Sequence, residues 1–139
     1  MLSWRIGLPI IVLLRKFFLF GEPMLKIAIL VREETTAKCT GQGCLRSFFA
    51  KTAGFARYRG REVELAGFFH SGGDLDHKLA KLKSAGVQVI HVSTCMRGKY
   101  PGYEALVRKI GRDFDVIGYT HGSEDGKMTK TVSVTGKYL

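Results

Sequence analysis

The order of the apolar segments along the chain is the feature that most constrains how it can fold. From residue 24 onward, short apolar runs alternate with segments whose apolar residues recur at helical spacing. The apolar runs cover residues 26–31, 62–69, 87–94 and 114–120. Helical connections of this length join parallel strands, and nearly continuous apolar strands suit a sheet covered on both faces. The sequence therefore predicts a three-layer α/β fold with helices on both faces of a mostly parallel four-stranded sheet.

The helical segments refine this prediction. Right-handed crossovers give the four strands the order 2-1-3-4, as in flavodoxin-like and Rossmann-like sheets. Asp74 or Asp76 can cap the second helix, and residues 131–134 alternate polar and apolar side chains, which predicts a short edge strand. The residues expected on buried helix faces are Leu45, Phe48, Phe49, Thr52 and Ala56 in the first segment, Leu75, Leu79 and Leu82 in the second, and Tyr103, Leu106, Val107 and Ile110 in the third.

Composition indicates a single globular domain over residues 24–139. The 139-residue chain is 45% hydrophobic, which is enough apolar material to bury a core. Three cysteines are too few for the disulfide framework of a small secreted domain, so we expect a reducing, cytoplasmic environment. The formal net charge is +10, but Lys and Arg form no dense run. We therefore do not expect nucleic acid as a partner.

Residues 1–23 differ in composition from the rest of the chain. The apolar stretch at residues 6–14 is followed by Arg15 and Lys16, so it is too short to span a bilayer, which needs roughly 20 apolar residues. No small-residue cleavage site of a secretory signal follows it. We interpret residues 1–23 as an N-terminal extension outside the domain, with translation starting at Met24; the alternative is a weak amphipathic segment at a membrane surface. A membrane partner is not expected.

The reactive side chains follow the predicted strands at one edge of the sheet. Loops after parallel strands all emerge at the carboxyl edge, where ligands bind in open α/β sheets. Cys39 and Cys44 follow the first strand, and His70, Ser71 and Asp74 follow the second. Cys95 follows the third strand and His121 follows the fourth. With the order 2-1-3-4, the loops after the first and third strands flank the point where the winding reverses. We therefore expect the three thiols to meet there.

Three kinds of chemistry are open to these residues. Zinc takes thiolate and imidazole ligands, which predicts a metal site of Cys39, Cys44, Cys95 and His121, with His91, His70 and Asp74 in reserve. The first alternative is a metal-free thiol oxidoreductase in which Cys44, at the start of a helix, is the nucleophile and Cys39 or Cys95 resolves it. The second alternative is an anion or nucleic-acid binding module, with amides of the turn 40–43 beside Arg97 and Lys99. The glycines expected to form the anion-binding loops are Gly41, Gly43, Gly72 and Gly73.

The histidines differ in what they indicate. His70 and His121 end strands at the predicted site, whereas His77 falls in the first turn of a helix and is expected on the surface. His91 lies inside the third strand, where a core imidazole and a site residue are equally compatible with the pattern.

Two better-defined motifs are absent from the sequence. A cysteine phosphatase loop needs Arg six positions after Cys39, but Leu45 stands there and Arg46 comes one position too late. A Walker loop needs Gly-Lys-Ser or Gly-Lys-Thr, and neither tripeptide occurs. Nucleoside triphosphates are therefore not indicated as ligands.

A set of short motifs resembles the CGGC domain family over about residues 24–122. The motifs are Lys26-Ile27-Ala28-Ile29, Cys39-Thr40-Gly41-Gln42-Gly43-Cys44, Gly67-Phe68-Phe69, Ser71-Gly72-Gly73-Asp74, His91-Val92-Ser93-Thr94-Cys95-Met96 and Tyr119-Thr120-His121. That family is described as zinc-binding because of its many Cys and His residues, and it has no established reaction. The resemblance implies a metal-binding role without naming a substrate, and it agrees with a start at Met24.

The resemblance carries over only in part. Cys39 and Cys44 match the family's Cys-x4-Cys, His91 and Cys95 match its His-x3-Cys, and His121 matches its terminal Thr-His. The motif that names the family is changed, because Ser71 and Asp74 replace its two cysteines. This implies one of two situations. Either this chain has lost the family's site, or its ligands are the three remaining cysteines and His121, while the changed loop acts through backbone amides and as a helix cap.

Overall fold

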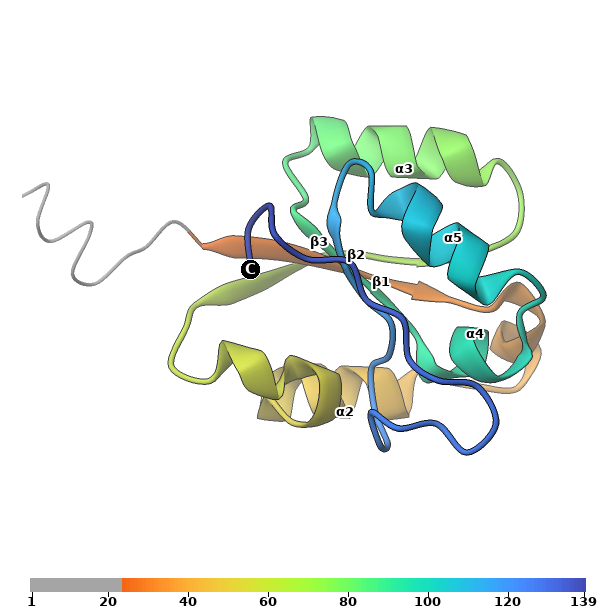
Figure 1. Ribbon diagram of the computed structural model, residues 1–139. Coiled ribbons are helices and arrows are strands. Elements are labelled where there is room, and N and C mark those ends of the chain that lie inside the picture. Colours follow the sequence, from red (N-terminus) through yellow and green to blue (C-terminus); the bar gives the residue numbers. More distant parts are fainter. Residues whose placement is uncertain (1–23) are drawn as a thin grey trace, which may run out of the picture.

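The computed structural model describes residues 24–139 as a central parallel sheet with helices on both faces (Figure 1). The strands are β1 (Leu25–Val31), β2 (Val63–His70), β3 (Val89–Val92) and β4 (Asp115–Ile117). Their order is β2-β1-β3-β4, and all three pairings are parallel. Both the predicted α/β class and the predicted order 2-1-3-4 are confirmed. The interpretation of residues 1–23 as an N-terminal extension and its alternative, a weak amphipathic segment, concern residues outside the described range.

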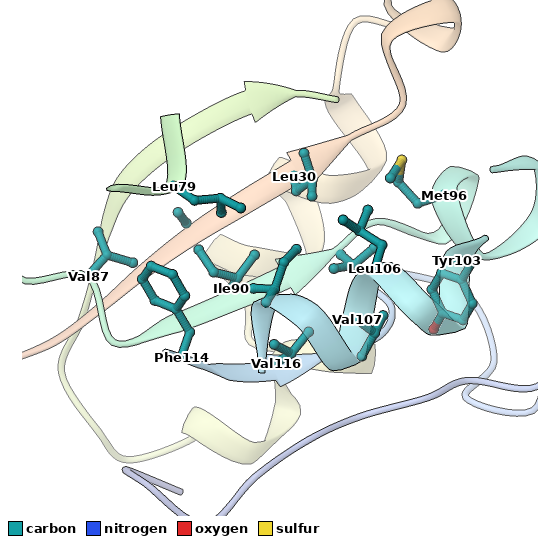
Figure 2. Close-up of a cluster of buried hydrophobic side chains, with 13 residues drawn as sticks. Leu30, Leu79, Val87, Ile90, Met96, Tyr103, Leu106, Val107, Phe114 and Val116 are labelled. Atoms are coloured by element: carbon teal, nitrogen blue, oxygen red, sulfur yellow. The ribbon is translucent and has the colours of Figure 1, made fainter. Parts of the chain in front are cut away.

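The helices divide the interior into two cores. α3 (Leu75–Ser84) and α5 (Tyr103–Ile110) lie on one face of the sheet, and α2 (Gln42–Ala50) with the 3-10 helix η2 (Ala53–Tyr58) lies on the other (Figure 1). Figure 2 shows the first core, in which Leu30 and Ile90 of the sheet pack with Leu79, Leu106 and Val107 of the helices. The second core joins Ile27 and Ile29 to Phe48, Phe55 and Tyr58. β1 is buried because it contributes to both.

The first predicted helix is wrong in its length. α2 ends at Ala50, and Lys51 and Ala53 then take left-handed backbone angles with φ of 54° and 51°. These two residues reverse the chain into η2, which buries Phe55 and Tyr58 against the sheet. Burial of two large aromatic side chains outweighs the cost of about 1 kcal/mol for each left-handed residue. Phe49, predicted on the buried face of this helix, is 73% exposed.

The carboxyl edge of the sheet carries two short helices that the sequence pattern did not predict. β3 ends at Val92 instead of continuing to residue 94, and α4 (Thr94–Lys99) begins directly after Ser93. The loop after β1 contains the 3-10 helix η1 (Glu33–Ala37). Cys95 therefore lies in the first turn of a helix and not at the end of a strand.

Strand β2 contains an irregularity that changes which side chains face the site. Its pairing with β1 jumps from Leu65 to Gly67 at consecutive β1 residues, which leaves Ala66 as an extra residue. Side chains after such a bulge point to the opposite face from the one their spacing predicts. Leu65 accordingly packs in the second core, while Phe69 packs against the first.

The C-terminal segment is attached to β4 by polar contacts. Val134 forms an isolated antiparallel bridge with Val116, which is the one pairing found in the predicted edge strand 131–134. The Tyr103 hydroxyl donates to the Gly118 carbonyl at 2.7 Å and accepts from the Val132 amide at 3.0 Å. The carboxylate of Asp115, which is fully buried, accepts the backbone amides of Lys137, Tyr138 and Leu139. These contacts cover the β4 edge of the sheet. No helix within residues 24–139 has the length and apolar character needed to cross a bilayer.

Candidate functional site

A cavity of about 180 Å³ lies at the carboxyl edge of the sheet and is lined by all three cysteines and His121. Cys39 comes from the loop after η1, Cys44 from α2, Cys95 from α4, and His121 from the loop after β4. The other lining residues are Val31, Thr35, Thr36, Thr40, Gly41 and Phe68. The fold thus brings four soft donor side chains from four separate segments to one small space.

Cys44 is the most deeply buried of the three thiols. It lies in the first turn of α2 and is 5% exposed, with its Sγ 3.2 Å from the Thr120 hydroxyl. Burial raises the pKa of the Cys44 thiol, and the hydrogen bond to Thr120 opposes this shift only in part. The start of a helix favours a thiolate, but burial has the larger effect here. Cys44 is therefore a protonated thiol at neutral pH in this structure.

The other two thiols accept backbone hydrogen bonds. The Sγ of Cys95 accepts the Arg32 amide at 3.4 Å and lies 2.8 Å from the Ser93 hydroxyl. The Sγ of Cys39, an exposed residue, accepts the Gly41 amide at 3.3 Å. Both sulfurs thus have a backbone amide as a polar partner.

His121 is held in place through its backbone. The Thr94 hydroxyl donates to the His121 carbonyl at 2.7 Å and lies 3.2 Å from the His121 amide nitrogen. Burial, with a smaller contribution from the positive charge of Arg97, lowers the pKa of His121, so its imidazole is neutral at pH 7. The ring packs closely over Gly43, where an added Cβ would lie 3.1 Å from it. Gly43 therefore leaves room for a neutral imidazole at the start of α2.

The four donor side chains of the cavity are of the kinds that bind metals, but they do not point toward one common position. Thiol and imidazole are the ligands that zinc prefers. Nevertheless, no three Cys, His, Asp or Glu side chains of residues 24–139 are placed to hold a metal ion as they stand. Metal binding at this cavity thus requires its side chains to turn toward a common point.

The structure places the reserve ligands away from the cavity. His91 is fully buried and stacks on Phe55 with ring centroids 4.1 Å apart. Its Nδ1 lies 3.1 Å from the Tyr119 carbonyl and its Nε2 lies 2.7 Å from the Tyr58 hydroxyl, so both ring nitrogens have partners in the core. Burial lowers the pKa of His91 to about 3. His91 is a packed, neutral core residue.

His70 and the residues of the changed motif also have structural partners. His70 accepts the Gly72 amide through Nδ1 at 3.0 Å, and Asp74 caps α3 by accepting the His77 amide at 3.0 Å. The Ser71 hydroxyl accepts the Glu33 amide at 3.0 Å. None of these residues lines the cavity. His77 is exposed, as expected.

The glycines of the two predicted anion-binding loops lie in different surroundings. An added Cβ on Gly72 would overlap the Glu33 carboxylate, so an acidic group already lies beside the Gly72–Gly73 turn and disfavours an anion there. Gly41 and Gly43 lie at the cavity and the start of α2. The cations proposed beside them point elsewhere. The Arg97 guanidinium donates to the Ser123 carbonyl at 2.8 Å and the Thr131 hydroxyl at 2.7 Å, and Lys99 lines other cavities.

Three contributors to the site were missed by sequence reasoning. The Thr120 hydroxyl lies between Cys44 and Thr94, at 3.2 Å from the sulfur and 3.4 Å from the Thr94 hydroxyl. Both threonines directly precede a predicted ligand, His121 or Cys95, so their positions were a usable signal. Phe68 forms part of the cavity wall because it follows the β2 bulge. The neighbouring Gly67 was the only hint of that irregularity.

The thiols should differ in reactivity when no metal is present. At pH 7.5 we expect Cys39 to be alkylated by iodoacetamide at least about tenfold faster than Cys44, because Cys39 is exposed whereas burial raises the pKa of Cys44. Peptide mass spectrometry after timed quenching measures each rate, and a Cys39→Ser variant should lose the fast phase. Equal rates would show that Cys44 is an activated nucleophile and would favour the thiol oxidoreductase.

Comparison with known proteins adds one match. The family model described as CGGC domain matches residues 26–121. This range spans the motifs from β1 to His121, including the cavity-lining cysteines. No curated protein and no solved structure matches the chain.

Proposed function

Because the chain belongs to the CGGC domain family, we propose that it binds a soft transition-metal ion, zinc in the first place, at the carboxyl-edge cavity. The proposed ligands are Cys39, Cys44, Cys95 and His121. The observation that carries the proposal is that these four side chains, from four different segments, line one cavity of about 180 Å³. This volume suits an ion better than an organic ligand, whose pockets span roughly 300–1,000 Å³.

The chemistry of the donors selects the class of metal. Thiolate and imidazole favour zinc and other soft or borderline ions, whereas magnesium and calcium prefer oxygen ligands. Three thiolates carry one more negative charge than a divalent cation neutralises. The fourth ligand, His121, adds no charge to the site, because burial lowers its pKa and keeps the imidazole neutral. A zinc ion with four protein ligands would support structure, since catalytic zinc keeps one position open for water.

Binding requires the donor side chains of the cavity to rearrange. Cys44 must lose its proton and exchange its contact with Thr120 for the metal. Cys39 is exposed and belongs to no helix or strand, so it is the ligand least restrained by packing. Cys95 and His121 are linked through Thr94, whose hydroxyl holds the His121 backbone next to the start of α4. Those two side chains thus form the more rigid half of the proposed site.

The changed family motif is consistent with this choice of ligands. Ser71 and Asp74 both have backbone hydrogen-bond partners, and neither lines the cavity. The three remaining cysteines therefore supply the thiolates in the proposed set.

Metal analysis of matched variants tests the proposal. Protein purified reduced, without a tag and after zinc supplementation should contain about one zinc per chain. Cys44→Ser, Cys95→Ser and His121→Ala should each lower zinc affinity by at least about 100-fold, because loss of a ligand costs more than the 10–100-fold effect of an outer-shell partner. His77→Ala is the matched control, since His77 is an exposed histidine outside the cavity, and it should bind like wild type.

The opposite results are equally clear. Less than about a tenth of an equivalent of any transition metal in the supplemented wild-type protein would rule out the metal-binding role. Full binding by both Cys44→Ser and Cys95→Ser would rule out this ligand set. Circular dichroism of each variant separates lost ligation from lost folding.

A further inference from the structure

A long segment of the chain carries positive charge without any negative charge. No Asp or Glu occurs between Glu34 and Glu62. The cations in this segment are Lys38, Arg46, Lys51, Arg57, Arg59 and Arg61. They are spaced along the sequence, so the pattern alone shows no dense basic run.

The fold collects five of these cations into one layer. All except Lys38 belong to α2, η2 and their flanking residues, and Figure 1 shows α2 on the face of the sheet opposite α3 and α5. On the α3–α5 side, three of the cations form ion pairs with carboxylates: Lys83–Asp113 at 2.8 Å, Lys109–Asp76 at 2.7 Å and Arg108–Glu104 at 3.1 Å. Within residues 24–139, Arg46, Arg57 and Arg59 form no ion pair with a carboxylate. The two faces of the domain therefore differ in charge.

Two of the arginines are oriented by the backbone of this layer. The Nε of Arg57 donates to the Gly54 carbonyl and the Nε of Arg59 donates to the Lys51 carbonyl, both at 3.0 Å. Both residues are exposed, although the Arg57 side chain also hydrogen-bonds to the Tyr119 hydroxyl. A guanidinium held at Nε, as in Arg59, keeps its terminal amino groups for another acceptor, and their planar fork fits phosphate oxygens.

One exposed aromatic ring belongs to the same layer as these charges. Phe49 is 73% exposed and lies one helical turn from Arg46 on α2. Its ring is supported edge-to-face by the buried Phe48, with centroids 5.0 Å apart. An exposed aromatic ring beside cations is the combination that binds unpaired bases and the phosphates that connect them.

We propose that this basic face, defined as Arg46, Phe49, Arg57 and Arg59, binds single-stranded nucleic acid. The arginines would contact the phosphates, and one unpaired base would stack on Phe49. An anionic membrane surface fits less well, because Phe49 is the only exposed large hydrophobic residue of residues 42–61 and offers little apolar area for insertion. None of the four residues lines the cysteine cavity, so this inference is independent of the metal site.

Fluorescence anisotropy with a labelled 20-nucleotide oligo(dT), measured with the full chain from low to moderate salt, tests the proposal. Wild type should bind with an affinity that falls with salt concentration. Arg46→Glu with Arg59→Glu should lower the slope of log affinity against log salt by about 1.4, since each phosphate contact on a single strand contributes about 0.7. Phe49→Ala should weaken binding about tenfold without changing that slope, whereas Phe49→Trp should bind with the wild-type affinity.

The matched control reverses two charges on the other side of the sheet. Lys81→Glu with Arg112→Glu changes two exposed cations of the α3–α5 side by the same total charge. This variant should keep at least half of the wild-type affinity. Equal losses in the two double variants would overturn the proposal, because binding would then follow net charge alone. Absence of oligonucleotide binding, or binding only to phosphatidylserine vesicles, would overturn it as well.

Discussion

Acidification from pH 7 to pH 4 should lower the free energy of unfolding by about 3 kcal/mol through His91 alone. Burial lowers the pKa of His91 to about 3 in the folded protein, against an ordinary value of 6.5. Between these two values the unfolded chain binds a proton that the folded chain does not bind. Stability therefore rises with pH across this window, and it falls as the pH drops below about 6.5.

The structural cause is a buried hydrogen-bonded imidazole. Its Nδ1 donates to the Tyr119 carbonyl, so its Nε2 carries the lone pair that accepts the Tyr58 hydroxyl. A proton on Nε2 would place an unpaired charge in the core beside Phe55. His121 and Asp113 also have lowered pKa values and lose stabilisation in acid, so the contribution of His91 must be isolated.

Urea unfolding at a series of pH values measures this effect. His91→Gln should be less stable than wild type at pH 7, because the ring that stacks on Phe55 is lost. Between pH 4 and 6.5, however, the stability of this variant should change less with pH than that of wild type, by about 3 kcal/mol over the interval. A variant with the same pH dependence as wild type would show that His91 is not the buried neutral group described here.

Replacing Gly54 by alanine should destabilise the protein by about 2–3 kcal/mol and disturb the cysteine cavity. A Cβ at this position would lie 2.6 Å from the Tyr119 carbonyl oxygen and 3.2 Å from that of Thr120. The Gly54 amide also donates to the Thr120 carbonyl at 3.1 Å. Because both obstacles are backbone atoms, residues 119–121 must shift, and they carry the Thr120 hydroxyl and His121.

Thermal unfolding and alkylation of Cys44 measure the two parts of this prediction. The Gly54→Ala variant should expose Cys44 to faster alkylation, since its contact with Thr120 is weakened. Gly98→Ala is the matched control, because an added Cβ meets nothing within 4 Å and Gly98 lies in helix α4. A Gly54→Ala protein as stable as the Gly98→Ala protein would contradict the close packing of η2 against the end of β4.

The alternation of apolar runs with helical segments was sufficient to predict the layers of the fold, and the right-handed winding of parallel crossovers predicted the strand order. α5 is found over the predicted residues Tyr103–Ile110. The first helix was wrong because residues 45–56 keep a helical spacing of apolar side chains while the chain reverses at Lys51. The spacing shows only which residues are apolar, and it stays the same when the backbone reverses through left-handed residues. Only the tertiary packing of Phe55 and Tyr58 decides that the chain turns.

The sequence was sufficient to predict at which edge of the sheet the site lies, but not which residues at that edge line the cavity. Topology alone brings loops after parallel strands to one edge, and this was enough to gather Cys39, Cys44, Cys95 and His121 around one cavity. It did not separate these residues from His70, which lies at the same edge but packs with the Gly72 amide and Lys78. That choice depends on side-chain contacts of a few ångströms, which residue spacing does not encode.

The central claim is that Cys39, Cys44 and Cys95 act together as ligands of one metal ion. The most direct test is site-resolved alkylation of the reduced, metal-free protein during titration with zinc. The account predicts that the alkylation rates of all three cysteines fall together, with an end point at about one zinc per chain. A rate for Cys39 or Cys95 that stays unchanged when zinc is added would contradict it.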